Sequence, residues 1–222
     1  MRNKLLTLAA AAAVLGVAAP AALAAEWGNL PNWSGVWVPV PGKADPAVVY
    51  KAGVKRAAKA DDPMKTCGLH AGMPRMMAHQ GAHEFVIRPE EVWLTTEVQD
   101  SVARIHTDGR NHAQGEDLFD TYTGDSIGHW EGKGAGQTLV IDTVGLRDDT
   151  WLDGRGTVHS DKAHVVTRIH KAGATLVAKI TVEDPETLAK PWSVTRTYRR
   201  MPAGAFAHDW ACHLVKSTKD TD

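Results

Sequence analysis

Cysteine and net charge are both scarce in this chain of 222 residues, which has two cysteines and a formal charge of −1 with histidine neutral. A nucleic-acid-binding protein normally shows an excess or a stripe of basic side chains, so the balanced charge argues against that class of partner. Phenylalanine and tyrosine are also rare, at three residues each, whereas there are eight tryptophans and eleven histidines. The hydrophobic content of 43% suffices for a packed core and argues against a disordered chain.

Long apolar runs are absent except at the N-terminus. Residues 1–25 begin with two basic side chains, continue through an apolar stretch and end in the small-x-small triplet Ala22-Leu23-Ala24. This order, with Pro20 closing a short apolar segment, is typical of a cleaved signal peptide rather than of a membrane anchor. We therefore expect a single mature domain over residues 26–222, periplasmic, without membrane insertion and without a nucleic-acid partner.

The two cysteines, Cys67 and Cys212, are far apart in the sequence. Because an exported protein folds under oxidising conditions, we expect a disulfide between them. A closed loop of about 145 residues would stabilise the fold by about 4–5 kcal/mol in the chain-entropy model. The alternatives are two buried thiols, or a role for Cys212 beside His213 as a metal ligand or nucleophile.

Turn residues recur at short intervals along the mature chain and separate segments rich in β-branched and aromatic side chains. One helix is expected, over residues 47–61. Because helices do not alternate with strands, we expect an all-β fold, an antiparallel up-and-down barrel, with a β-sandwich as the alternative. The predicted strands cover residues 33–39, 84–88, 91–98, 102–107, 129–131, 138–144, 164–170, 176–182 and 192–200.

The first predicted strand carries the motif Gly35-x-Trp37. This motif is similar to the beginning of lipocalin-type barrels, in which the tryptophan caps the closed end and an arginine of the last strand packs on it. Arg196 or Arg199 could take the place of that arginine here. The resemblance implies a lipocalin-like barrel.

Several longer motifs are spread over the mature chain: GMPRMM at residues 72–77, RIHTDGRNH at 104–112, SIGHWEG at 126–132, LVIDT at 139–143 and WLD at 151–153. Together they resemble a large group of exported bacterial proteins, mostly of unassigned function, that is abundant in sphingomonads and related soil bacteria. The resemblance implies a small barrel-like domain and carries no settled reaction. Members of that group usually have an aspartate in the turn that corresponds to residues 132–137. In this sequence the turn is longer and lacks the aspartate, so no role of that aspartate is carried over.

The motif at residues 104–112 is the most polar of these segments. Side chains alternate along a strand, so Arg104, His106 and Asp108 share one face, and Arg110 and His112 follow at the turn. An arginine beside an acid–base pair suits the binding of an anion or oxyanion. The alternative is a solvated face with a flanking ion pair.

A second group centres on Asp142, a carboxylate within an apolar strand and on the face of Val140 and Val144. A buried carboxylate is costly unless it is paired, and His159 or His164 could be its partner. Since histidine titrates near neutral pH, we expect general acid–base chemistry from these three residues. A purely structural network explains the same pattern.

Tryptophan and methionine side chains are expected to line a ligand pocket. Trp130 and Trp151 offer flat rings, and Met73, next to Arg75, offers an adaptable apolar surface. Core packing is the alternative for each of these residues. The histidine spacings match no helical metal motif, so no cofactor is expected, and a metal held by histidines of separate strands is a minor alternative.

These features predict a cofactor-independent periplasmic enzyme, a lyase or isomerase, that acts on a small aromatic or cyclic molecule through histidine and aspartate acid–base chemistry. The first alternative is a non-catalytic lipocalin-like carrier of a small apolar ligand. The second is a metal-dependent enzyme with histidine ligands. Convergence of His159, His164 and Asp142 next to a cavity would favour the enzyme.

Overall fold

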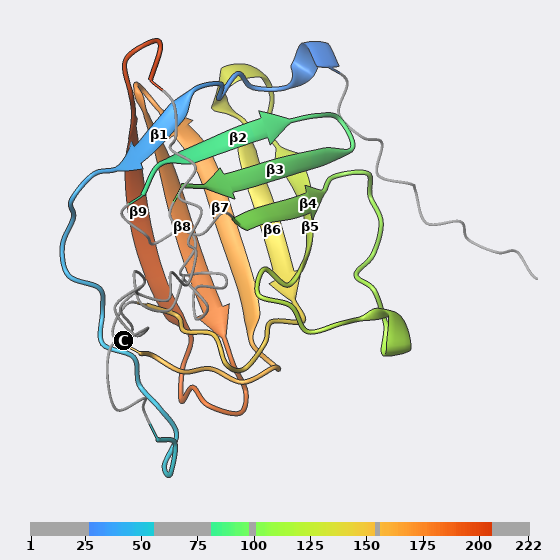
Figure 1. Cartoon of the computed structure of the whole chain (residues 1–222), viewed down its shortest axis with the longest axis vertical. Helices are drawn as coiled ribbons and strands as arrows, with labels where there is room; N and C mark the ends of the chain where they lie inside the picture. The colour runs from blue at the N-terminus through green and yellow to red at the C-terminus, as the bar shows by residue number, and fades with distance from the viewer. Residues whose placement is uncertain (1–26, 56–80, 98–100, 154–155, 206–222) are drawn as a thin grey trace, which may run out of the picture.

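Nine strands close into one barrel in the computed structural model, which describes residues 27–55, 81–97, 101–153 and 156–205. The strands follow one another around the barrel in chain order, and the last pairs with the first (Figure 1). They are β1 (Val36–Pro39), β2 (His83–Ile87), β3 (Glu91–Thr96), β4 (Ser101–His106), β5 (Asp125–Glu131), β6 (Thr138–Val144), β7 (His164–Ala172), β8 (Thr175–Glu183) and β9 (Trp192–Arg200). The predicted all-β barrel, with its strands in chain order, is thus confirmed.

Helix is confined to three short 3-10 turns in the described part of the chain: η1 (Trp27–Asn29), η2 (Gly115–Asp117) and η3 (Gly134–Gly136). No helix among these residues is long and apolar enough to cross a membrane. The signal peptide at 1–25 and the cysteines Cys67 and Cys212 lie outside the described residues.

The predicted helix over residues 47–61 is wrong for residues 47–55, and the remainder lies outside the described residues. Tyr50 instead forms an isolated antiparallel bridge with Leu188, and the Val49 carbonyl accepts a hydrogen bond from Ala189 N–H. The β-branched pair Val48 and Val49 favours this extended backbone. Gly53, at φ +86°, then turns the chain in a conformation that no helix contains.

The prediction of a wholly antiparallel barrel is wrong at one junction. β4 and β5 run parallel and are joined by two residue pairs, Ile105 with Ser126 and His106 with Ile127. Parallel neighbours need a connection of a dozen or more residues, which the segment 107–124 supplies. Asp108-Gly109, a pair common in hairpin turns, begins a long crossing here.

The inner faces of the strands form the core. β8 shows the alternation clearly, since Leu176, Ala178, Ile180 and Val182 are all fully buried and the residues between them are not. Trp33 adds two edge-to-face ring contacts, with Phe85 at 5.5 Å and with Trp130 at 5.3 Å between ring centres. Rings in this arrangement contribute beyond their buried area.

The arginines of β9 do not take the places expected for a lipocalin-type closed end. Arg196 forms two hydrogen bonds to Asp45, of 2.6 and 2.7 Å, and Arg199 contacts the sulfur of Met201. It is Arg200 whose guanidinium lies against Gly35, the residue directly before β1.

The connection between β6 and β7, residues 145–163, covers one end of the barrel. Leu146 and Leu152 of this connection are fully buried in the core. The connection is fastened by Asp184, which accepts hydrogen bonds from Ser160 N–H at 2.7 Å and Ser160 Oγ at 2.8 Å. Burial by itself would raise the pKa of Asp184, but hydrogen bonds from Thr187 and Ser160 lower it to about 2.

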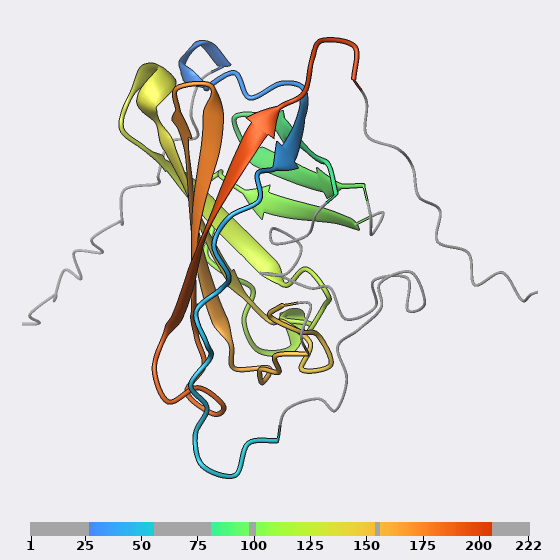
Figure 2. The same ribbon diagram turned by 90° about the vertical axis from the view of Figure 1, so that its left-hand side faces the viewer.

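Figure 2 shows the barrel from the side. The long strands β6 to β9 form its tall wall, and the shorter β2 to β4 lie opposite and cover the upper part only. The two walls meet at the sparse β4–β5 pairing. The barrel wall is held by only two residue pairs at this junction, as it is between β1 and β2.

Candidate functional site

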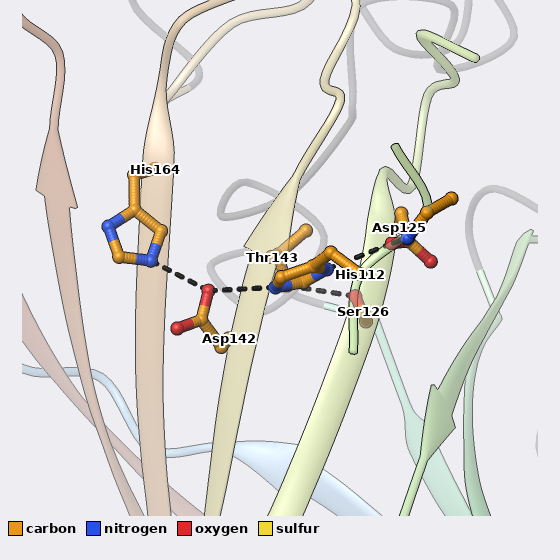
Figure 3. Close-up of polar contacts among 7 residues, drawn as sticks. His112, Asp125, Ser126, Asp142, Thr143 and His164 are labelled. Carbon is orange, nitrogen blue, oxygen red and sulfur yellow. Dashed lines mark hydrogen bonds and ion pairs between the residues drawn. The ribbon is translucent and has the colours of Figure 1, made fainter. Parts of the chain in front are cut away.

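Four side chains next to this junction form a continuous chain of polar contacts (Figure 3). Asp142 Oδ1 lies 2.6 Å from His164 Nε2 and 3.2 Å from His112 Nε2. The other ring nitrogen of His112, Nδ1, lies 2.8 Å from Asp125 Oδ2. The chain thus alternates imidazole and carboxylate, in the order His164, Asp142, His112, Asp125.

Strand alternation places this His–Asp chain on the outer face of the barrel. In β6, Ile141 and Thr143 are buried on the inner face, so Asp142 between them points outward. His164 leaves the start of β7 on the same outer face. His112 belongs to the 107–124 connection, whose crossing brings it over β5 and β6.

The expectation that Asp142 is buried among apolar side chains is wrong. Its side chain is 39% exposed, because the face that it shares with Val140 and Val144 is the outer one. Since His112 is 21% exposed and His164 is 39% exposed, a solute can approach all three groups.

The number of hydrogen bonds that His112 makes to its two carboxylate neighbours depends on how many of its ring nitrogens carry a proton. When His112 is protonated, both ring nitrogens donate, one to Asp142 and one to Asp125. When it is neutral, only one nitrogen carries a proton, and one of the two contacts loses its hydrogen bond. Both contacts of His112 are therefore hydrogen bonds only when each ring nitrogen carries a proton.

A pocket of about 880 Å³ adjoins the His–Asp chain, and Asp142 is part of its wall. Its lining combines outward-facing residues of β5 and β6 with inward-facing ones, which places it at the β4–β5 junction. Gly128 lets Ile105 of β4 pack directly against the backbone of β5, because a Cβ at this position would lie 2.8 Å from Ile105 Cγ2. The lining residues used below are Arg110, Ile127, Trp130, Gln137, Val140 and Asp142.

Arg110 lines the pocket, but its charge is shared with Asp108. The guanidinium donates to both carboxylate oxygens, with Nε at 3.0 Å from each and Nη2 at 2.6 Å from Oδ2. This hydrogen bonding lowers the pKa of Asp108 and raises that of Arg110. Arg110, the predicted anion-binding residue, is therefore already paired with a carboxylate. Asp108 is its ion-pair partner rather than an acid–base group. Lys133 brings a further positive charge to the same pocket, which His129 also lines.

Arg104 and His106 do not line the pocket. The guanidinium of Arg104 lies over the ring of Trp93, 4.8 Å from its centre, as does that of Arg88 at 5.1 Å. His106 lies opposite Glu91 on the same outer surface of β3 and β4. Arg104 and His106 do share one face of β4, as predicted, but that face is not part of the pocket that Asp142 lines.

The predicted group of His159, His164 and Asp142 is only partly assembled. His164 contacts Asp142, whereas His159 is 3% exposed within the 145–163 connection. Its ring bonds with Thr150 Oγ1 at 2.6 Å and with the Ser160 carbonyl at 2.8 Å. Burial lowers the pKa of His159, so this residue is held neutral. It has no place in the candidate site.

Of the residues predicted to line a pocket, only some do so. Trp130 lines the pocket with its ring against Trp33, but Trp151 belongs to the 145–163 connection, where it forms an isolated bridge with Val158. Met73 and Arg75 lie outside the described residues.

Sequence reasoning missed Asp125 and Gln137. Asp125 comes directly before the motif at residues 126–132, but nothing in the sequence reveals that the 107–124 connection brings His112 onto it. Gln137 stands in a glycine-rich turn and carries no motif. Among the residues that the structure describes, no group of three or more His, Cys, Asp or Glu side chains has an arrangement that could hold a metal ion.

Comparisons with known proteins add little to this picture. No family model and no curated protein matches the chain. Among solved structures, an abundant heat soluble (SAHS) protein from Ramazzottius varieornatus is similar over 76% of this chain and 95% of that chain, at 10% identity and a TM-score of 0.33. Similarity at this level assigns no function.

Proposed function

We propose that this protein is a lipocalin-like binding protein of the periplasm, and that its small-molecule ligand occupies the pocket at the β4–β5 junction. The observation that carries the proposal is the pocket's lining. Ile127, Val140 and the ring of Trp130 supply apolar walls, while a few polar groups such as Asp142 stand among them. Such a mixture is typical of sites that bury an apolar ligand and orient it by a few hydrogen bonds.

Size and placement also support this function. A volume of about 880 Å³ falls within the range of pockets that hold small molecules. A pocket beside the short β4–β5 pairing also provides binding surface without disturbing the closely packed core.

The proposal is tested with 8-anilinonaphthalene-1-sulfonate, an apolar fluorescent probe whose sulfonate suits Arg110 and Lys133. We expect saturable enhancement of its fluorescence by the wild-type protein. Ile127→Trp fills the pocket from its outer wall and should weaken the affinity at least tenfold, since an indole would take the volume that the probe needs. Equal affinity of wild type and Ile127→Trp would overturn the proposal.

A matched control separates pocket filling from a general effect of added tryptophan. Val86 is an outward residue of β2 that is 40% exposed and does not line the pocket. Val86→Trp should bind the probe as the wild type does. Circular dichroism and thermal unfolding of both variants establish that each is folded.

A second candidate function, cofactor-independent acid–base catalysis, is favoured by the His–Asp chain. Asp142 both lines the pocket and accepts from His164, so a proton could pass between a bound molecule and the imidazoles. The chemistry that suits such a chain is proton abstraction from, and return to, a small cyclic molecule, as in an isomerase or lyase.

Proton transfer is detectable without knowledge of the natural substrate. A panel of cyclic ketones and lactones is incubated with the protein in D2O, and mass spectrometry follows deuterium incorporation at acidic carbon positions. The catalytic candidate predicts incorporation above the buffer rate that Asp142→Asn removes. Incorporation that persists in Asp142→Asn, or none at any concentration of protein, contradicts it.

A further inference from the structure

Two residues that line the pocket each carry a buried polar atom with no hydrogen-bond partner among the described residues. Gln137 is 5% exposed, and its side-chain Oε1 is buried and accepts from none of them. The indole Nε1 of Trp130 is likewise buried and donates to none of them. Buried polar groups are nearly always paired in folded proteins, so each requires an explanation.

The two groups are neighbours on the same face of the sheet. Trp130 on β5 stands opposite Leu139 on β6, and Gln137 precedes Leu139 by two residues. Diagonal positions of this kind on one face have their Cα atoms about 7–8 Å apart, within reach of one bridging group for two long side chains. Both residues line the pocket.

Their hydrogen-bonding capacities are complementary. The indole N–H only donates, and the amide Oε1 only accepts. A single ligand group that accepts from Trp130 and donates to Gln137 satisfies both. Hydroxyl groups, as in phenols and alcohols, have this dual capacity, and so do carboxamides and lactams. A carboxylate lacks the proton that Oε1 needs.

We infer that the pocket recognises a neutral ring compound through a hydroxyl or carboxamide group held between Trp130 Nε1 and Gln137 Oε1. This inference rests on the proposed binding function and adds the ligand's chemical class. The ring of the ligand lies among Ile127, Val140 and the Trp130 indole. Its polar group points inward, and the side chains of Trp130 and Gln137 turn to expose the two buried atoms to it. The cationic side chains at the pocket, Arg110 and Lys133, are then not the main determinants of recognition.

The test uses four probes of similar size: phenol, benzamide, benzoate and toluene. Binding is followed by two-dimensional NMR of the tryptophan indole N–H groups, with the Trp130 resonance assigned from its absence in Trp130→Phe. In the wild type, phenol and benzamide should move this resonance downfield as the N–H gains an acceptor. Toluene should bind without that shift, and benzoate should gain nothing over toluene.

The decisive quantity is a ratio of affinities, because phenol and toluene also differ in their own hydration. Gln137→Leu keeps the size of the side chain and removes its amide. We expect the affinity of phenol relative to toluene to fall about fivefold to tenfold in Gln137→Leu, the effect of one net hydrogen bond. Trp130→Phe should reduce the same ratio, because it removes the indole donor.

Trp93→Phe is the matched control. Trp93 also carries a buried indole nitrogen with no partner among the described residues, but it lies on the outer surface under two arginines and does not line the pocket. Its substitution should leave every ratio unchanged.

Two other outcomes are decisive and distinguishable. If Gln137→Leu leaves the ratio of phenol to toluene unchanged while all probes still bind in the pocket, the inference is overturned and the binding function stands. Bound water would then be the partner of both groups. If no probe perturbs any resonance of the pocket, the proposed function falls, and the inference falls with it.

Discussion

His159 and His164 are five residues apart in the sequence, yet their environments are opposite. His159 is buried at the covered end of the barrel between the Thr150 hydroxyl and the Ser160 carbonyl. His164 is 39% exposed and contacts the carboxylate of Asp142. The ring of the first histidine is hydrogen-bonded only to neutral groups, which fix its position. The second histidine is part of a chain of ionisable groups open to solvent.

This difference teaches that the partner and the exposure of a histidine, rather than its place in a motif, decide what it can do. A buried imidazole with neutral partners contributes to folding, because burial disfavours its charged form. An exposed imidazole beside a carboxylate contributes little to folding and stays available for proton exchange. Four predictions test the contrast.

The largest effect is expected at Asp184, which holds the segment around His159 in place. Asp184→Ala leaves Ser160 and Thr187 without their shared acceptor and should lower the free energy of unfolding by about 3 kcal/mol. Urea unfolding followed by tryptophan fluorescence measures the change. Asp161→Ala, which removes an exposed ion pair with Lys162, should cost less than about 0.5 kcal/mol. Equal losses would show that Asp184 does not fasten the connection.

The next effect compares the two histidines directly. His159→Ala removes a buried ring and its two hydrogen bonds, so we expect a loss of about 2 kcal/mol in unfolding free energy. His164→Ala should change that free energy by less than about 0.5 kcal/mol. The same urea experiment applies to both variants, and similar losses for both would remove the contrast.

The third prediction concerns pH. The pKa of His159 is lower in the folded protein than its ordinary value of 6.5, so the unfolded chain binds the extra proton first. The stability that neutral His159 provides is therefore present above pH 6.5 and is lost as the pH falls below it, by at most about 1.4 kcal/mol per pH unit. His159→Gln should flatten this dependence, whereas His164→Gln should keep it. A steep dependence that survives in His159→Gln contradicts the assignment.

The smallest effect on folding is expected at Asp142. Asp142→Asn should alter the free energy of unfolding by less than about 0.5 kcal/mol, because the residue is half-exposed on the outer face. Its consequence should appear instead in the imidazole 15N chemical shifts of His112 and His164 at one fixed pH, because both rings lose their carboxylate partner. Unchanged shifts in both rings would show that the His–Asp chain is not formed in solution.

Much of the barrel could be predicted from the sequence, because alternation and turn residues are local signals. Strands such as β8 and β9 follow directly from their pattern of buried and exposed side chains. The parallel β4–β5 junction could not be predicted, since Asp108-Gly109 is a common hairpin signal and here starts a crossing. The extended segment at residues 47–55 was missed because its partner, Leu188, is distant in sequence.

The site was only half predictable for the same physical reason. A pattern within one strand shows that Asp142 differs from its neighbours, but it does not show which face is outward. The contact of His112 with Asp142 depends on the path of an 18-residue connection. The separation of His159 from His164 depends on the burial of Leu146 and Leu152. None of these is a local property.

The proposed ligand pocket and the buried site of His159 lie in different parts of the barrel, and one measurement distinguishes them. Backbone amide shifts of the 15N-labelled protein are recorded as 8-anilinonaphthalene-1-sulfonate is added. Binding in the pocket predicts the largest shifts in residues 127–130 and 140–142. Shifts concentrated in residues 146–160, with the amides of β5 unmoved, would contradict it.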